Sequence, residues 1–299
     1  MKKTILAIFI ACLCTFTVKS QNIDTYFQSV RTGSYPQIPS AFFSGDMGLM
    51  NQLTPYYKDS IDDVRGKAYY IAYRSATNND NQKIKKTAIE ALIEGIKDKD
   101  SGLAGDNIEF LTEFDKDLFS TKDQQELLSA LSTIKYHKPE LIKLIGYVNI
   151  SEAENTLKSY AASSNRRLQW SALLALSRMG DEASAQNIIS ILENLPVNDN
   201  LVYELVPDLV YTRNKAAFDY LFTIINSNEN NCTSADPDNE VAILCGYRVM
   251  EYLAPHLTAQ PLPTEDGELA VDNYEQALQE LRAWYAVNKS DYSISDEGY

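Results

Sequence analysis

The chain has 299 residues, of which 44% are hydrophobic and 23% are charged, so it holds enough apolar side chains for a substantial core. That composition excludes disorder of the whole chain. Its 27 basic and 41 acidic residues give a net charge of -14, which repels phosphate backbones and anionic lipid surfaces and argues against nucleic-acid binding.

Residues 1–20, MKKTILAIFIACLCTFTVKS, are predicted to be a signal peptide. Two lysines precede an apolar run of about ten residues, which is too short to cross a membrane. Val18 and Ser20 are small enough for the positions that signal peptidase recognises, so Gln21 would begin the mature protein. We therefore expect export to the periplasm or secretion. Cleavage removes three lysines and no acid, which leaves 24 basic residues against 41 acidic ones and a net charge of -17.

A lipid anchor is the alternative to simple cleavage. Acylation of Cys12 or Cys14 would make the protein a lipoprotein, although the bulky Phe9 fits the required motif poorly. An ordinary N-terminal core helix is a further alternative, which the leading lysines disfavour. No later stretch stays apolar for about 18 residues, so no transmembrane span is expected in the mature chain.

Residues 21–44 are expected to form an N-terminal cap, and residues 45–289 a series of helix pairs. In the cap, NIDTYFQSV has the pattern of a short helix, and Thr32 to Pro39 should be a loop. In the series, apolar residues recur every three or four positions. This pattern predicts an all-α fold, an α-solenoid of about five or six antiparallel helix pairs, with a non-solenoid helical domain as the alternative. The pairs are Val64–Leu92, Ile108–Leu131, Leu141–Ala161, Leu168–Leu192, Leu201–Ile225 and Val241–Val287.

Two of these units align with each other at an offset of 33 residues. RLQWSALLALSRMGDEASAQNIISILE, residues 167–193, matches NLVYELVPDLVYTRNKAAFDYLFTIIN, residues 200–226, at seven apolar positions. Gly180 can end the first helix in the left-handed conformation, and Asp181 can cap the second helix. Each pair has an apolar stripe too wide to bury alone, so neighbouring pairs are expected to stack.

The pattern DVRGKA, which begins at Asp63, and the central stretch RLQWSALLALSRMGDEASAQNIISIL resemble HEAT repeats, especially the short type first noticed in phycobilisome lyases. The resemblance covers about Asp46 to Asn288. Only Arg65 stands where the family usually has arginine, since Gln169 and Ala242 replace it in other units. The resemblance implies that the first helix of each pair lines the concave side. It also implies a scaffold and not a particular chemistry.

The end of the chain departs from the repeat pattern. Residues 254–271, APHLTAQPLPTEDGELAV, form an insertion with three prolines and a glycine. A long loop is either functional or merely variable, and the sequence leaves both readings open. Residues 290–299 are predicted to be a flexible tail.

Cys232 and Cys245 are the only cysteines of the expected mature chain. An oxidising compartment permits a disulfide between them. Cys245 also lies in the apolar run VAILCGYRVMEYL, where a thiol commonly packs as a small core residue. The sequence favours two unpaired thiols and leaves the disulfide as the alternative.

The common catalytic and metal-binding motifs are missing from the sequence. His137 and His256 have no carboxylate or thiol at a metal-ligand spacing, so we expect both to be solvated at helix ends. The acidic residues 236–240 lack the glycine and the distant glutamate of a calcium loop, and a helix cap explains them at least as well. No serine lies in G-x-S-x-G. We therefore expect no catalytic residue, metal or cofactor, although the many carboxylates leave a hydrolase with an Asp/Glu pair open.

Aromatic side chains are the best candidates for contact with a ligand. Tyr69 and Tyr73 lie four residues apart beside buried positions of one helix, so they share a face that a groove would expose. Tyrosine offers a large contact area with a polar tip, which suits a peptide or a sugar ring. Packing between adjacent units is the alternative and is favoured for any single residue. The candidate binding residues are Tyr69, Tyr70, Tyr73, Arg74, Trp170, Tyr203 and Tyr211.

The leading functional hypothesis is a non-enzymatic interaction module, or scaffold, of the cell envelope that binds an unidentified protein or peptide on its concave face. It rests on the repeats, the export signal and the missing catalytic motifs. Binding of a glycan or small molecule by the tyrosine-rich face is the alternative, and an exported hydrolase comes third. Bilin lyase chemistry and DNA repair have no support in an exported, acidic chain.

Overall fold

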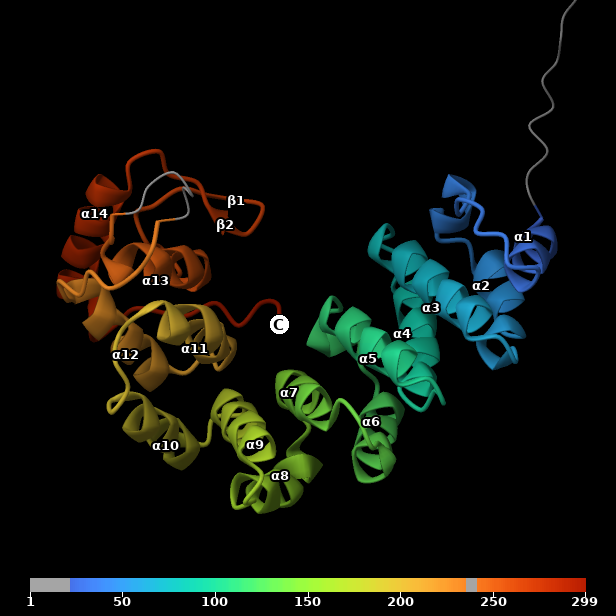
Figure 1. The fold of residues 1–299 in the computed structure, drawn as a ribbon, viewed down its shortest axis with the longest axis horizontal. Coiled ribbons are helices and arrows are strands. Elements are labelled where there is room, and N and C mark those ends of the chain that lie inside the picture. The colour runs from blue at the N-terminus through green and yellow to red at the C-terminus, as the bar shows by residue number, and fades with distance from the viewer. Residues whose placement is uncertain (1–21, 235–240) are drawn as a thin grey trace, which may run out of the picture.

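The computed structural model of this protein describes residues 22–234 and 241–299. In that part the chain forms helices α1 to α14 and one two-stranded sheet, and the helices are arranged in a curved arch (Figure 1). The predicted all-α solenoid is therefore confirmed. The expected signal peptide, with Cys12 and Cys14, and the acidic residues 236–240 lie outside the described residues. None of the described helices is both long enough and apolar enough to cross a membrane.

Six helix pairs build the arch, in agreement with the predicted five or six. Two helices precede them: α1 (Ile23–Arg31) lies in the predicted cap, whereas α2 (Met47–Leu53) lies just after it, in the range predicted for the solenoid. The pairs are α3 (Asp62–Thr77) with α4 (Gln82–Gly95), α5 (Ser101–Thr112) with α6 (Thr121–Thr133), α7 (Lys138–Val148) with α8 (Glu154–Ala161), α9 (Arg166–Arg178) with α10 (Glu182–Leu192), α11 (Asp199–Tyr211) with α12 (Lys215–Asn226), and α13 (Cys245–Leu253) with α14 (Tyr274–Asn288).

The helices lie in two rows. α5, α7, α9, α11 and α13, each the first helix of its pair, line the inner side of the arch, and most of their partners lie on the outer side (Figure 1). Neighbouring inner helices contact one another, and so do outer helices such as α10 and α12. The first helix therefore lines the concave side, as the resemblance to HEAT repeats implied.

The turn between α9 and α10 shows how the sequence ends one helix and begins the next. Gly180 has a φ of 93°, a left-handed conformation that glycine adopts without a steric penalty. The Asp181 N–H then donates to the Leu176 carbonyl at 2.9 Å and closes α9. The Asp181 carboxylate accepts the Ser184 N–H at 2.9 Å and caps α10. The predicted stop and start at these residues are both confirmed.

The 33-residue period of the sequence is also visible in contacts between units. Hydrogen bonds join four pairs of residues that are 33 positions apart, so equivalent places in successive units touch one another. This regularity is expected of a stack in which each unit contacts its neighbours. The bonded residues are Arg65 with Asp98, Ser75 with Phe42, Tyr147 with Phe114, and Arg178 with Tyr211.

The insertion contains two short elements that the sequence pattern did not predict. The 3-10 turn η5 (Ala254–His256) is followed by a hairpin of β1 (Thr264–Glu265) and β2 (Glu268–Leu269). Asp266 and Gly267 form its turn, and both have positive φ angles. Each strand has only two residues, too few to produce an alternating pattern.

The tail is not free, so the prediction of a flexible segment at residues 290–299 is wrong. Leu257 of the insertion pairs with Ile294 as an antiparallel bridge, and the Ser295 N–H donates to the His256 carbonyl at 2.8 Å. From there the tail continues along the inner side of the arch (Figure 1). Backbone pairing of this kind needs a partner segment that only the folded chain supplies, and for that reason the sequence did not indicate it.

Cys232 and Cys245 form a disulfide, so the favoured prediction of two unpaired thiols is wrong. Two backbone hydrogen bonds, of 3.3 and 2.7 Å, join Cys232 to Ile243 and turn the loop back toward the first residue of α13. Both cysteines are fully buried. The predicted burial of Cys245 is confirmed, but apolar surroundings do not distinguish a buried thiol from a buried disulfide.

Candidate functional site

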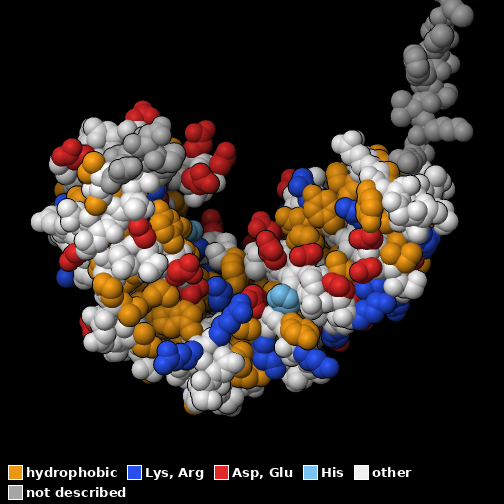
Figure 2. Space-filling view, in the orientation of Figure 1, with side chains coloured by type: hydrophobic (Ala, Val, Ile, Leu, Met, Phe, Trp, Pro, Cys, Tyr) orange, Lys and Arg blue, Asp and Glu red, His pale blue; other side chains and the backbone are white. Residues whose placement is uncertain are grey.

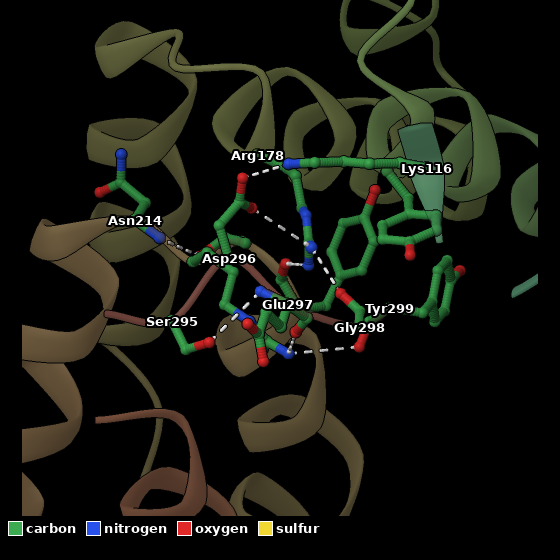
Figure 3. A network of polar contacts seen from close by, with 12 residues as sticks. Lys116, Arg178, Asn214, Ser295, Asp296, Glu297, Gly298 and Tyr299 are labelled. Atoms are coloured by element: carbon green, nitrogen blue, oxygen red, sulfur yellow. Dashed lines mark hydrogen bonds and ion pairs between the residues drawn. The ribbon is translucent and has the colours of Figure 1, made fainter. Parts of the chain in front are cut away.

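Basic and aromatic side chains from several units meet on the inner side of the arch, close to where the inner helices end (Figure 3). Lys116 lies in the 3-10 turn η3 (Lys116–Leu118) after α5, Arg178 ends α9, and Arg213 follows α11. Tyr147 and Tyr211 lie at the ends of α7 and α11. We call these five residues the cradle.

Arg178 is the centre of the cradle. Its guanidinium carbon lies 5.1 Å from the ring centroid of Tyr147 and 5.1 Å from that of Tyr211, and its side chain is only 2% exposed. A cation between two aromatic faces is attracted by both rings, more strongly where water is excluded. Arg178 also donates to the Tyr211 carbonyl, one of the carbonyls that the end of α11 leaves without a helical partner. The cradle therefore holds a buried positive charge between two aromatic rings.

The tail supplies the negative charge that faces this cation. Asp296 forms an ion pair with Lys116 and lies 3.6 Å from Arg178. Nη2 of Arg178 donates to the Gly298 carbonyl at 2.8 Å. One carboxylate and one carbonyl of the tail thus engage two of the three cradle cations (Figure 3).

The aromatic half of the cradle contacts Tyr299 of the tail. Its ring centroid lies 5.4 Å from that of Tyr147 and 5.2 Å from that of Tyr211. Burial, followed by the proximity of Tyr211 and Asp208, raises the pKa of Tyr299 well above its ordinary value. The Tyr299 hydroxyl is therefore neutral at physiological pH, and its ring acts as an aromatic anchor.

Arg213, the third cation, is less well satisfied. Its Nη1 donates to the Val210 carbonyl at 2.5 Å, but its Nη2 lies 3.5 Å from the Glu297 carbonyl and 3.3 Å from the backbone oxygen of Tyr299, and its buried Nε has no hydrogen-bond partner. Burial first, and then the positive charge of Arg178, lower the pKa of Arg213 to about 10. It still carries its charge at neutral pH, with only two long backbone contacts from the tail.

His256 lies near these cations, so the prediction that it is solvated is wrong. It is partly buried in η5, and burial, followed by the charges of Arg213 and Arg178, lowers its pKa to about 4. The imidazole is therefore neutral at physiological pH and adds no charge to the cradle. Its backbone carbonyl holds the tail, as described above.

Of the seven predicted binding residues, the structure places Tyr211 in the cradle. Its hydroxyl donates to the Lys143 carbonyl at 2.6 Å, and burial raises its pKa. Trp170 lies elsewhere on the inner helices, where its Nε1 donates to Asp208 at 2.6 Å. Tyr203 is 44% exposed on α11. These three therefore do not form one cluster, although all belong to inner helices.

The early aromatic residues pack between elements, as the alternative reading proposed. Tyr69 is only 3% exposed and stacks on Tyr57 with ring centroids 5.1 Å apart, so its prediction as an exposed ligand contact is wrong. Tyr73 stacks on Phe110 of α5 at 4.4 Å. The sequence could not separate exposure from packing at these positions. The difference depends on which element lies against the side chain, the 3-10 turn η2 (Tyr56–Lys58) for Tyr69 and α5 for Tyr73.

Arg74 and Tyr70 both contact Phe43, which precedes α2. The guanidinium carbon of Arg74 lies 5.8 Å from the Phe43 ring centroid, and the ring of Tyr70 meets Phe43 edge-on at 6.2 Å. Tyr70 also borders a hollow of about 440 Å³ between α3 and α5. Four carboxylates line the same hollow, those of Asp62, Asp63, Asp100 and Asp106.

Replacing Gly146 of α7 with alanine should lower the free energy of unfolding by about 1–2 kcal/mol. The new Cβ would lie 2.6 Å from Oη of Tyr211 and 2.7 Å from Cα of Ala175, so α7 and α9 would have to separate. Alanine favours the helix by about 1 kcal/mol, which offsets part of a larger packing cost. Urea denaturation measures the difference. Gly66→Ala is the control, since its Cβ meets the flexible end of Leu103; equal losses in both variants would contradict the prediction.

Sequence reasoning missed Lys116, Arg178 and Arg213. A signal was available for two of them: Arg178 and Arg213 each stand at the end of the first helix of a matched unit, shortly before the turn to the second. Cations are favoured at helix C-termini for general reasons, so this position alone does not mark a site. The docking of the tail was the information that the sequence lacked, because the position of the Asp296 carboxylate shows which cations lie together.

Comparison with protein-family models and with curated proteins gives no match to either. Over residues 22–234 and 241–299, no three His, Cys, Asp or Glu side chains are grouped so that they could hold a metal ion. The class of the protein thus follows from its fold, a helical solenoid, and the best-defined site is the cradle with its bound tail.

Proposed function

We propose that this protein is a non-enzymatic interaction module of the cell envelope, which binds a segment of a partner protein on the inner side of the arch. The observation that supports this best is the docking of the tail into the cradle. Lys116, Arg178 and Arg213, which follow or end three different inner helices, all contact the tail. Solenoids present extended surfaces of this kind because each unit adds contacts to those of its neighbours.

The chemistry of the cradle favours binding over catalysis. It offers cations and aromatic rings, which recognise carboxylates and apolar surface, and the neighbouring His256 has no acidic or nucleophilic partner among its described contacts. Figure 2 supports a role for charge: acidic side chains flank the opening of the arch, whereas basic ones gather near its middle. An acidic segment would therefore be attracted to the middle and repelled by the rims.

The proposed location in the envelope is supported by the buried disulfide. Structural disulfides persist in oxidising compartments such as the periplasm and are rare in reducing ones. The pattern of residues 1–20 supports the same location.

A photo-cross-linking amino acid at position 203 tests this function. Tyr203 is 44% exposed on α11, one of the inner helices, which packs against α13 (Figure 1). In intact cells, irradiation should give one dominant adduct with an envelope protein, identified by mass spectrometry. Val287 is the control, because it is 82% exposed on the outer helix α14 (Figure 1) and should give no such adduct. The same adduct from both positions, or none from position 203, would contradict the proposal.

Glycan binding is the second candidate, and the hollow between α3 and α5 favours it. Tyr70 and Phe110 border this hollow together with four carboxylates, a combination that suits stacking and hydrogen bonding to a sugar. Calorimetric titration of a glycan panel against the wild type and Tyr70→Ala separates the two candidates. Absence of heat from every glycan would remove this one.

A further inference from the structure

The tail fits the cradle incompletely, and the misfit lies on one side. The tail gives Arg178 a carboxylate and a carbonyl, whereas it gives Arg213 only two backbone oxygens, at 3.3 and 3.5 Å. The remaining hydrogen bond of Arg213, from Nη1 to the Val210 carbonyl at 2.5 Å, comes from α11 and not from the tail. The Glu297 side chain is exposed and forms no ion pair with either arginine. A side-chain carboxylate placed directly against Arg213 would add a shorter, charge-assisted hydrogen bond to these two long contacts.

The ion pairs that hold the tail in the cradle are also weak enough for another segment to replace them. The side chain of Asp296 remains 62% exposed in its ion pairs, and such solvated pairs contribute little to stability. A hollow of about 920 Å³ adjoins the tail and is lined by Thr112–Asp117, Tyr147 and residues 295–299. Another segment could therefore reach the cradle before the tail has left it.

We propose that the cradle binds acidic, tyrosine-containing segments of a partner protein, and that residues 293–299, SISDEGY, are its resident competitor. This inference rests on the proposed function and names the chemistry of the partner. The tail shows the arrangement that fits: a carboxylate for Lys116 and Arg178, and a tyrosine three residues later between Tyr147 and Tyr211. A partner with a further carboxylate for Arg213 displaces it.

The insertion takes part in this arrangement. Leu257 and Ile294 form a bridge just before the tail enters the cradle, and the Thr258 N–H donates to the Ser293 carbonyl at 3.0 Å. These contacts keep the tail near the cradle even when Asp296 and Tyr299 have left it. The tail is therefore present at a high effective concentration, and a partner must overcome this to bind.

The test uses the full chain and a fluorescein-labelled peptide SISDEGY, with binding followed by fluorescence anisotropy. The variant Asp296→Ala/Tyr299→Ala removes the two side chains that occupy the cradle. We expect it to bind the peptide about tenfold more tightly than the wild type, because the tail no longer blocks the cradle. Glu297→Ala removes the same charge as Asp296→Ala but no ion pair, so it should bind like the wild type.

Two further measurements localise the binding. A peptide with asparagine in place of its aspartate should bind the double variant about three- to fivefold less tightly than the native peptide does. Adding Lys116→Ala to the double variant should weaken binding of the native peptide by a similar factor. The Lys116 side chain is 27% exposed, so this substitution should leave the fold intact, which circular dichroism checks. Equal binding by the wild type and the double variant, or by the two peptides, would overturn the proposal.

The outcomes separate this inference from the proposed function. If position 203 cross-links to a partner but the peptide measurements fail, the interaction module stands and the cradle is not its site. If the peptide binds as expected and no partner is cross-linked, the cradle recognises this chemistry and the proposed function fails. Concentration-dependent dimerisation that Asp296→Ala/Tyr299→Ala abolishes would overturn the proposal in favour of a second copy as the occupant.

Discussion

Replacing Arg65 with methionine is expected to lower the free energy of unfolding at pH 7 by about 3–5 kcal/mol. Nε and Nη2 of Arg65 each donate to Asp98 at 2.7 Å, and the two side chains are only 4% and 3% exposed. Nη1 donates to the Asp59 carbonyl at 2.9 Å. Methionine fills much of the space but leaves the Asp98 carboxylate buried without its cation. Urea denaturation monitored by circular dichroism measures the loss.

The pH dependence of this variant has a definite sign. Burial alone would raise the pKa of Asp98, but the hydrogen bonds from Arg65 and the Asp100 N–H, with the charges of Arg65 and Lys99, bring it below its ordinary value. In the wild type this stabilisation is present above the unfolded-state pKa, about 4, and is lost as the pH falls through the lower folded-state pKa. In the variant the buried carboxylate has a raised pKa. The penalty should therefore shrink as the pH falls from 7 toward about 4.

Two variants control for this result. Arg167→Met breaks an ion pair with Glu140 in which the arginine side chain is 75% exposed and the glutamate side chain 38%. This change should lower the free energy of unfolding by at most about 1 kcal/mol. Arg65→Met/Asp98→Leu removes both charges and should recover most of the loss, because no unpaired charge remains. If Arg65→Met costs no more than Arg167→Met, the buried pair does not stabilise the stack of units as we expect.

Removal of the disulfide by Cys232→Ala/Cys245→Ala should lower the free energy of unfolding by about 3 kcal/mol. The bridge closes a loop with a sequence separation of 13, and the loss of that constraint stabilises the unfolded chain by roughly this amount. Thermal unfolding with and without dithiothreitol measures the effect. Because the loop leads into α13, the loss should also increase hydrogen exchange at the start of that helix.

The double alanine variant provides its own control for the reductant. Dithiothreitol should destabilise the wild type by a similar amount and should leave the variant unchanged, since the variant has no disulfide to reduce. A wild type that unfolds at the same temperature in both conditions would show that the bridge contributes nothing to stability. The result also bears on location, because a stabilising disulfide has value only in a compartment that maintains it.

The repeats could be predicted because their determinants are local. Gly180 and Asp181 end and begin helices through contacts within five residues, and the apolar stripes of α9 and α11 are visible at a spacing of three and four. The cradle could not be predicted in the same way. Tyr211 was a candidate for its flanking position alone. Arg178 was missed because the tail residues that mark it as part of a site lie far along the chain, as its 120-residue separation from Gly298 shows.

The sequence by itself therefore determined the all-α class and a series of five or six helix pairs, since both follow from short-range periodicity and capping. The position of the first helices on the inner side was implied only by the resemblance to HEAT repeats. The tertiary structure alone decided that Cys232 and Cys245 pair, that Tyr69 packs against Tyr57, and that the tail occupies the cradle. These features depend on which distant segments the curvature of the arch brings together. Curvature is set by the packing of many units, and no short stretch of sequence encodes it.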